Sequence, residues 1–257
     1  MSTDRTRIRW NGWGWTAHQD DLAGREALWT WLAGELGMPA LLATPARALD
    51  SIVLRPTRLS KAALDKFTAV LGAERVRGED YERAFHALGR SYHDLIRLRA
   101  GDLSTAPDAV LYPRSGEEVL AVLAIAGEQG VAVVPYGGGT SVVGGVTGST
   151  GPYKSVVTLD LSCMDRLIEV DQMSQTATAE AGIPGPVLEK ALKANGFTLG
   201  HHPQSFEFST LGGWIAHRGA GQGSNGYGRA EDWLVGAKLA TPRGVLAVGG
   251  FPSSSAG

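Results

Sequence analysis

The chain has 257 residues, 43% of them hydrophobic, which is enough for one large domain or two modest ones with a packed core. Its formal net charge of −2 leaves no overall basic footprint, so nucleic acid is excluded as an expected partner. Cys163 is the only cysteine, which excludes an internal disulfide and a cysteine-rich metal site. The sequence contains neither a long apolar run nor the apolar core of a signal peptide, so we expect a cytoplasmic protein.

The first hundred residues show helical periodicity. Apolar residues between positions 28 and 36 recur at helical spacing and stop at Gly37. Ser60 is placed to cap a second helix, which Gly72 would end. Residues 1–104 are therefore predicted to form a mainly helical N-terminal region.

A third helix is predicted over residues 81–98, with a broad apolar face. Arginines repeat along this helix, and we expect them to lie on a solvated or ion-paired face. These arginines are Arg83, Arg90, Arg97 and Arg99.

From residue 105 the pattern changes to alternating strands and helices. A strand at residues 109–112 precedes a helix that Ser115 and Glu118 can begin as a capping box, and a strand at residues 131–134 follows. Such a β-α-β unit implies parallel strands and a right-handed crossover. Further strands are predicted at residues 156–160, 167–171 and 176–180, with a helix around residues 187–192 and a hairpin over residues 233–248. We therefore expect an α+β domain over residues 105–257, not a doubly wound sheet.

A glycine-rich loop follows the strand that ends at residue 134. Glycines let successive backbone N–H groups approach an oxyanion, and Thr140 and Ser141 add short donors, so a diphosphate is the expected ligand. No lysine lies between residues 131 and 151, which excludes a Walker loop. Val142 occupies the position where a Rossmann fingerprint would need its third glycine. A flexible surface loop is the remaining alternative.

A second polar cluster spans residues 200–214. Ser209 or Thr210 could cap a helix that starts at Leu211, and a helix N-terminus suits a phosphate or a polarised ring oxygen. Two anion-binding loops imply an extended ligand such as a dinucleotide. His201 and His202 are adjacent, so both cannot point at one metal from a strand, and no metal is expected. One of them could face the flavin or substrate, but for either histidine taken alone a hydrogen-bonded structural role is favoured.

Together these motifs resemble the FAD-binding domain of the vanillyl-alcohol oxidase superfamily, and within it the alkylglycerone-phosphate synthase family. The matching motifs lie in order at residues 10–14, 107–113, 135–141, 180–183, 200–213, 231–232 and 241–244. The resemblance implies an FAD-binding domain of two small α/β subdomains behind a helical N-terminal region.

The resemblance also implies three contact strips for FAD. The first would wrap the diphosphate and comprises Pro135, Tyr136, Gly137, Gly138, Gly139, Thr140 and Ser141. The second would contact the flavin end and comprises Gln204, Ser205, Phe206, Glu207, Phe208, Ser209 and Thr210. The third comprises His217, Arg218, Gly219 and Ala220.

Several expectations about the chemistry follow from the same resemblance. Relatives with covalently attached flavin often carry a histidine in the first strip, where this chain has Thr140 and Ser141, so the FAD is expected to be dissociable. His201 is the candidate catalytic residue, placed near the reacting carbon. The family often has aspartate at the position of Gln204 and a Thr-Arg-Ala-Ser run in the third strip, which puts individual side-chain contacts in question.

The implied activity is exchange of the acyl group of acyl-dihydroxyacetone phosphate for a fatty alcohol in ether-lipid synthesis. An FAD-linked oxidoreductase of a 2-hydroxy acid or alcohol and an inactive FAD-binding fragment stay open as alternatives. Family members continue past the position of Gly257 with a cap domain, so the chain is expected to be truncated, to bind FAD weakly and to lack turnover.

Partners are a small-molecule or lipid substrate, with peripheral membrane contact and a homodimer left open. For the tryptophans between residues 10 and 15, core packing is expected over a membrane-facing patch.

Overall fold

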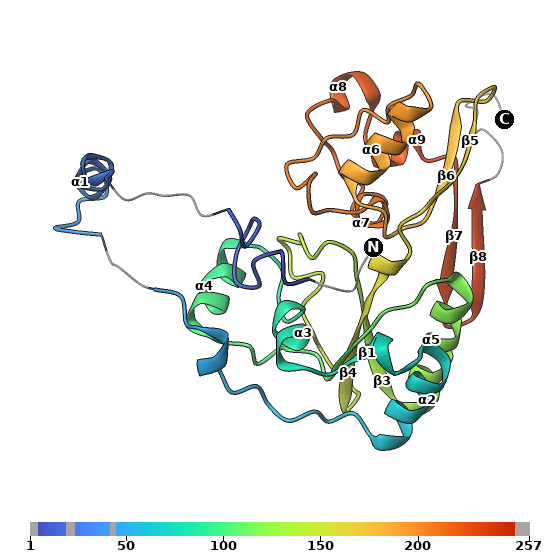
Figure 1. The fold of residues 1–257 in the computed structure, drawn as a ribbon, viewed down its shortest axis with the longest axis horizontal. Coiled ribbons are helices and arrows are strands. Elements are labelled where there is room, and N and C mark those ends of the chain that lie inside the picture. The colour runs from blue at the N-terminus through green and yellow to red at the C-terminus, as the bar shows by residue number, and fades with distance from the viewer. Residues whose placement is uncertain (1–4, 19–23, 42–44, 250–257) are drawn as a thin grey trace.

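The computed structural model describes residues 5–18, 24–41 and 45–249 and shows an α+β fold, as expected (Figure 1). Its central sheet has four strands in the order β1-β2-β4-β3. The strands are β1 (Val76–Arg77), β2 (Ala109–Leu111), β3 (Val131–Tyr136) and β4 (Ser155–Asp160). β2 and β3 both run parallel to β4, and β1 closes the edge antiparallel to β2. The predicted β-α-β unit is therefore parallel, but β4 lies between its two strands.

Helices α2 (Lys61–Leu71) and α5 (Gly116–Gln129) pack together against this sheet (Figure 1). Phe67 of α2 is fully buried in one cluster with Val122 of α5 and Val157 of β4. Burying an apolar side chain of this size stabilises the fold by roughly 1.5–3 kcal/mol. The hydrophobic core thus continues across residue 104, and the division into residues 1–104 and 105–257 stays a prediction.

Local capping explains where these helices begin. The Ser60 hydroxyl accepts a hydrogen bond from Ala63 N at 3.1 Å, as predicted, and Gly72 ends α2 with a φ of +85°. Ser115 caps α5 by accepting from Glu118 N. The reciprocal half of the predicted capping box is wrong, because the Glu118 carboxylate instead accepts from Arg114 N at 2.7 Å and pairs with Arg75 at 2.5 Å.

The single helix predicted over residues 81–98 is wrong. The structure has α3 (Asp80–Phe85) and α4 (Tyr92–Ala100), with Ser91 and Asp94 forming a capping box that restarts the helix. The intervening turn lies on the loop after β3: Arg90 N donates to the Ser141 carbonyl at 2.7 Å, and a Cβ on Gly89 would overlap that same oxygen. This contact with a distant loop breaks the helix.

The arginines were expected on a solvated or ion-paired face, and the solvated part is wrong at two positions, although Arg83 lies 3.9 Å from Asp80. Arg83 is buried and donates to the carbonyl oxygens of Pro107 at 2.8 Å and Arg55 at 2.7 Å. Arg90 is buried beside the same turn. Arg97 follows the expectation and pairs with Asp102 at 2.8 Å.

The second half of the chain forms a separate cluster above the sheet, with two hairpins at its side (Figure 1). The strands are β5 (Leu167–Asp171), β6 (Thr176–Ala179), β7 (Gly236–Thr241) and β8 (Gly244–Gly249). The helices are α6 (Gly185–Ala194), α7 (Leu211–Ala216), α8 (Ser224–Tyr227) and α9 (Ala230–Trp233). Ile183, Leu188 and Trp214 form the centre of its core. The predicted hairpin over residues 233–248 is present, although its first strand begins at Gly236.

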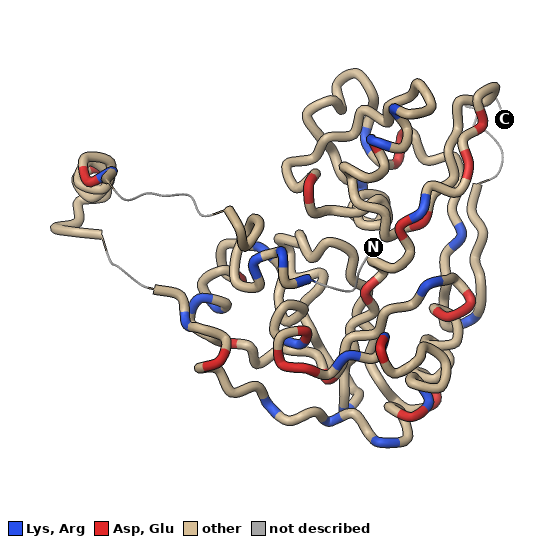
Figure 2. Tube along the Cα trace, viewed as in Figure 1, with Lys and Arg blue, Asp and Glu red and all other residues tan. Residues whose placement is uncertain are grey.

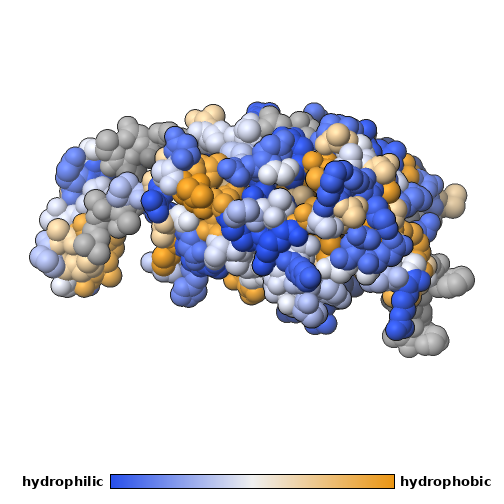
Figure 3. Space-filling view, turned by 90° about the horizontal axis from the view of Figure 1, so that it is seen from below, coloured by the Kyte–Doolittle hydropathy of each residue, from blue (hydrophilic) through white to orange (hydrophobic). Residues whose placement is uncertain are grey.

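Short 3-10 turns complete the fold at η1 (Leu49–Ser51), η2 (Ala73–Arg75) and η3 (Leu161–Cys163). Helix α1 (Glu26–Glu35) stands apart from the rest, with Trp29 and Trp31 exposed (Figure 1). On the face shown in Figure 3, hydrophilic residues break the apolar surface into small areas. Within the described ranges, no helix combines the length and apolar content needed to cross a bilayer.

Candidate cofactor site

The glycine loop (residues 135–145) lies directly against the second strip (residues 204–210). A Cβ on Gly137 would overlap the Thr210 hydroxyl, and one on Gly138 would overlap the Phe208 carbonyl oxygen. Gly139 has a φ of +69°, and a Cβ there would overlap the Tyr136 hydroxyl. Gly137 and Gly138 are therefore required by the close approach of two chain segments, which also brings the two strips predicted to contact FAD into one place. Gly139 is required by its positive φ and by Tyr136 of the same loop.

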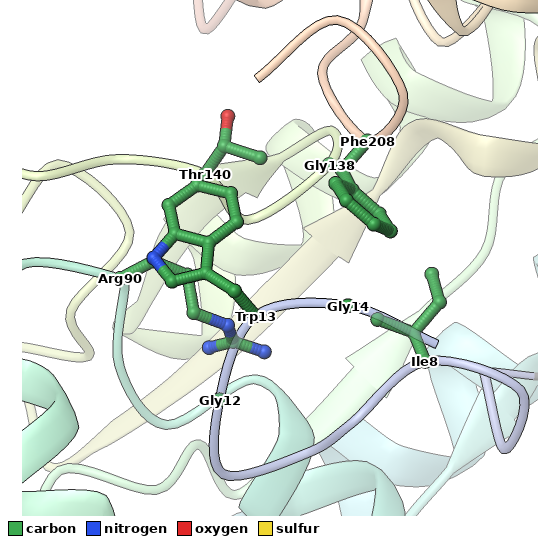
Figure 4. A pocket seen from close by; sticks show the side chains of 8 residues that line it. All are labelled: Ile8, Gly12, Trp13, Gly14, Arg90, Gly138, Thr140 and Phe208. Carbon is green, nitrogen blue, oxygen red and sulfur yellow. The ribbon is translucent and has the colours of Figure 1, made fainter. Parts of the chain in front are cut away.

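The two hydroxyls of the glycine loop have different surroundings. Ser141 Oγ accepts from Gly145 N at 3.0 Å and from Val143 N at 3.4 Å, so it shapes the end of the loop. Thr140 instead lines a small pocket (Figure 4). The pocket is bounded by Ile8, Gly12, Trp13, Gly14, Arg90, Gly138, Thr140 and Phe208.

Residues 5–16, which we call the N-terminal strap, form one wall of this pocket. The strap is a short hairpin-like loop held by a bridge between Ile8 and Trp15. The rings of Trp13 and Trp15 contact Phe208 with centroid distances of 6.2 and 5.1 Å, while Trp10 packs against the buried cores. The expected core packing is found for Trp10. Trp13 is exposed and Trp15 is half-buried, and both contact Phe208 at the candidate site.

The second strip supports helix α7 in an unexpected way. Neither predicted cap forms: Thr210 holds the N-cap position of α7 without a side-chain hydrogen bond. Ser209 Oγ instead accepts from the Trp214 indole at 2.7 Å and donates to the Ser205 carbonyl at 2.9 Å. Phe206 stacks near Trp214, with ring centroids 6.3 Å apart. The remaining members, Gln204 and Glu207, have exposed side chains.

The third strip (residues 217–220) follows the end of α7 and reaches the far end of the glycine loop. A Cβ on Gly145 would lie 3.6 Å from His217 Cε1. Arg218 has a φ of +51°, which is unusual for a residue with a side chain, and its guanidinium lies 3.6 Å from Glu231. Gly219 accepts a hydrogen bond from Ala230 N at 3.0 Å, and Ala220 is exposed. All three predicted strips are therefore neighbours, and their individual contacts with FAD stay predictions.

His201 lies apart from the pocket lining, in the core of the second cluster. Its ring is 2% exposed and packs on Trp214 and Trp233, with centroid distances of 4.7 and 5.5 Å. Neither ring nitrogen has a hydrogen-bond partner among the described residues. Burial, with a smaller contribution from the neighbouring His202, lowers the pKa of His201, so the ring is neutral. Its predicted catalytic role stays a prediction.

A buried ionic network lies beneath the glycine loop, and sequence reasoning missed it. Arg5 of the strap pairs with Asp160 at the end of β4 at 2.6 Å, and Asp160 also contacts His86 Nε2 at 2.9 Å. Burial opposes the charge on Asp160, but the attraction of Arg5 and the hydrogen bond from His86 outweigh it and hold the pKa of Asp160 well below its usual value. The network ties the strap to the strand that lies beside β3.

These residues fit a bound dinucleotide. Gly138, Thr140 and Arg90 line one pocket, and glycine backbone, hydroxyl and guanidinium groups are the types of donor that bind a diphosphate. In contrast, the described ranges contain no group of three or more His, Cys, Asp or Glu residues that could hold a metal ion.

Comparison with known proteins agrees with this geometry. A model of the FAD binding domain matches residues 107–249. Alkyldihydroxyacetonephosphate synthase from Dictyostelium discoideum is 34% identical over 98% of this chain and 45% of its own length. A solved structure of an alkyldihydroxyacetonephosphate synthase superposes with a TM-score of 0.86 at 34% identity, over 97% of this chain and 49% of the other.

An uncharacterised FAD-linked oxidoreductase of Escherichia coli (strain K12) is also 34% identical, over 77% of this chain and 41% of its own length. The chain thus spans about half the length of the relatives it matches. The match to the FAD binding domain model implies that the cofactor is FAD. The chain belongs to the FAD binding domain family.

Proposed function

We propose that this chain provides the FAD-binding part of an alkyldihydroxyacetonephosphate synthase. The reaction would replace the acyl group of acyl-dihydroxyacetone phosphate with a fatty alcohol, a step of ether-lipid synthesis. The substrate class is therefore a small phosphorylated molecule that carries a lipid chain.

One observation carries this proposal: the likeness to the synthases extends over the N-terminal region. The FAD binding domain model starts at residue 107, whereas the Dictyostelium synthase matches 98% of the chain. The E. coli oxidoreductase matches 77%, so its likeness also extends before residue 107 but over fewer residues. Residues before 107 include the N-terminal strap and Arg90, which line the candidate pocket. The features shared with the synthases therefore include part of the site.

The residues of this chain would position the cofactor. When bound, FAD would supply the flavin ring as the reactive group of the enzyme. The glycine loop and Thr140 would hold the diphosphate, and Phe208 with Trp13 would shield it from water on one side. We expect the FAD to be held without a covalent bond.

The test uses the protein purified from the cells that produce it, incubated with acyl-dihydroxyacetone phosphate and a labelled fatty alcohol. The proposal expects label in an ether-linked product and release of a fatty acid, with no lasting reduction of the flavin. Flavin absorbance should separate from the polypeptide after denaturation. Absence of label in any lipid product, with FAD bound, would contradict the synthase assignment.

An FAD-linked oxidoreductase is the second candidate, favoured by the identity of 34% to the E. coli protein. Its signature is bleaching of the flavin by a 2-hydroxy acid or an alcohol under anaerobic conditions. The same preparation can be used for both tests, so the two candidates are separated by one set of samples.

The location and partners belong to the same proposal. A substrate with a fatty chain suits a cytoplasmic enzyme with peripheral membrane contact, and the exposed Trp29 and Trp31 of α1 are compatible with it. Co-sedimentation with lipid vesicles tests the membrane contact. Light scattering of the purified protein tests the homodimer.

A further inference from the structure

Arg90 is a buried cation that forms no ion pair with any residue the structure describes. Three arginines are buried in the described chain: Arg75, Arg83 and Arg90. Arg75 has a carboxylate of Glu118 at 2.5 Å, and Arg83 has one of Asp80 at 3.9 Å. Among the described residues, the Arg90 guanidinium hydrogen-bonds to backbone carbonyls alone, those of Leu88, Gly89 and Arg9 at 3.0 to 3.4 Å, and it lies over the Phe85 ring at 5.5 Å from the centroid. Burying an arginine in this way is costly, because carbonyl dipoles compensate a full charge only in part.

The residues around Arg90 are suited to binding an anion. Arg90 is 6% exposed and lines the pocket together with Gly138 and Thr140. Figure 4 shows the Trp13 indole between Thr140 on one side and the Arg90 guanidinium on the other. A guanidinium carries five donors, so it can keep its carbonyl bonds and still offer N–H groups to a phosphate oxygen.

The N-terminal strap holds this arrangement closed. Arg90 Nη2 donates to the Arg9 carbonyl at 3.4 Å, while Arg5 Nη2 donates to the Gly137 carbonyl at 3.1 Å. The strap therefore bridges the Arg90 turn and the glycine loop. Figure 2 shows basic residues on this segment. The strap residues that line the pocket itself, Ile8, Gly12, Trp13 and Gly14, are uncharged.

We propose that Arg90 binds the diphosphate of FAD and that the N-terminal strap closes this side of the site. Both lie outside residues 107–249, the span of the FAD binding domain model. The inference rests on FAD as the cofactor, but not on which reaction the enzyme performs. It assigns cofactor affinity to a part of the chain that precedes the family domain.

The test compares the affinities of FAD and riboflavin for the whole chain by fluorescence titration at two salt concentrations. Riboflavin lacks phosphate, so its affinity reports only the flavin contacts. Arg90→Gln should bind FAD about 10- to 100-fold more weakly, the range for one lost charge-assisted hydrogen bond, with riboflavin affinity unchanged. Its FAD affinity should also depend less on salt than that of the wild type.

Arg83→Gln is the matched control, because Arg83 is equally buried and bonded to carbonyls but does not line the pocket. It should keep the wild-type affinity for FAD. Arg90→Lys keeps the charge without the planar fork, and an affinity between the wild type and Arg90→Gln is expected. Arg90→Lys also provides the test if Arg90→Gln fails to fold, with weaker FAD binding and unchanged riboflavin binding again expected.

The strap is tested by Trp13→Ala, with Trp31→Ala on the separate helix α1 as its control. Weaker FAD binding in Trp13→Ala alone supports the proposal. Equal FAD affinity in the wild type and the Arg90 variants would overturn it, as would an equal loss for FAD and riboflavin, which indicates a structural role. A wild-type chain that binds riboflavin but no FAD would overturn the cofactor assignment as well.

Discussion

Arg5 donates hydrogen bonds to both carboxylate oxygens of Asp160, at 2.7 and 2.6 Å, and to the Gly137 carbonyl at 3.1 Å. The residues are 155 positions apart, and the Asp160 side chain is fully buried. One guanidinium thus connects the N-terminal strap, the end of β4 and the glycine loop. The stability of the fold and the shape of the candidate site share this contact.

Removing one partner of this pair should be strongly destabilising. Asp160→Ala leaves the Arg5 charge without compensation in the interior, so the free energy of unfolding should fall by about 3–5 kcal/mol. Urea denaturation measures the change. Asp65→Ala, which breaks the exposed pair with Lys61, is the control and should cost less than about 1 kcal/mol. If Asp160→Ala lowers the free energy of unfolding by as little as Asp65→Ala does, the buried pair contributes little to stability.

The same pair predicts a loss of stability in acid. The folded pKa of Asp160 is lowered from its usual value of 3.8, so the unfolded chain takes up the proton first. Stability from this group is fully present above about pH 4 and declines as the pH falls toward the folded pKa. Urea midpoints between pH 5 and pH 2.5 should fall, and Asp160→Asn should show a shallower decline. Parallel curves for the two proteins would exclude Asp160 as the source.

Gly138→Ala should disrupt the contact between the glycine loop and the second strip. The new Cβ would overlap the Phe208 carbonyl, and because both are backbone-anchored, one loop must move. We expect lower thermal stability and weaker FAD binding. Gly127→Ala, inside helix α5 with open space around it, should instead stabilise the fold by roughly 0.5–1 kcal/mol. Wild-type FAD affinity in Gly138→Ala would argue against the cofactor role of this contact.

His201 should make stability sensitive to mild acid. Its folded pKa is lowered from the usual 6.5 by burial, so the unfolded chain binds the proton more readily. Its contribution is complete above about pH 6.5 and declines as the pH falls below that value. His201→Phe should reduce the difference in unfolding free energy between pH 7.5 and pH 5.5, whereas His93→Phe, at an exposed position, should preserve it. If the difference in unfolding free energy between pH 7.5 and pH 5.5 is the same in His201→Phe as in the wild type, His201 is not its source.

Much of the site could be predicted because its motifs are local. The run of glycines, the hydroxyls at Thr140 and Ser141 and the start of α7 at Leu211 are visible as short sequence patterns. The contacts that require them are distant: Gly138 packs on Phe208, and Leu211 N donates to the Ile183 carbonyl at 3.1 Å. Arg90 carried no such signal. In the sequence it belongs to a repeated set of arginines, and only its burial beside the pocket that Thr140 also lines distinguishes it from Arg97.

Most of the longer helices and strands and the family were predictable from the sequence, since periodicity, caps and turn residues act over short range. Strand β1 and helices α8 and α9 were not predicted, and α3 and α4 were predicted as one helix. Tertiary structure decided which predicted elements survive and which charges are buried. The Ser141 carbonyl breaks a helix at Gly89, and Asp160 draws in Arg5, because each depends on atoms brought together only when the sheet forms. Contacts between residues so far apart in the chain cannot be predicted from the spacing of residue types in the sequence. Such contacts form the side of the pocket that Arg90 lines.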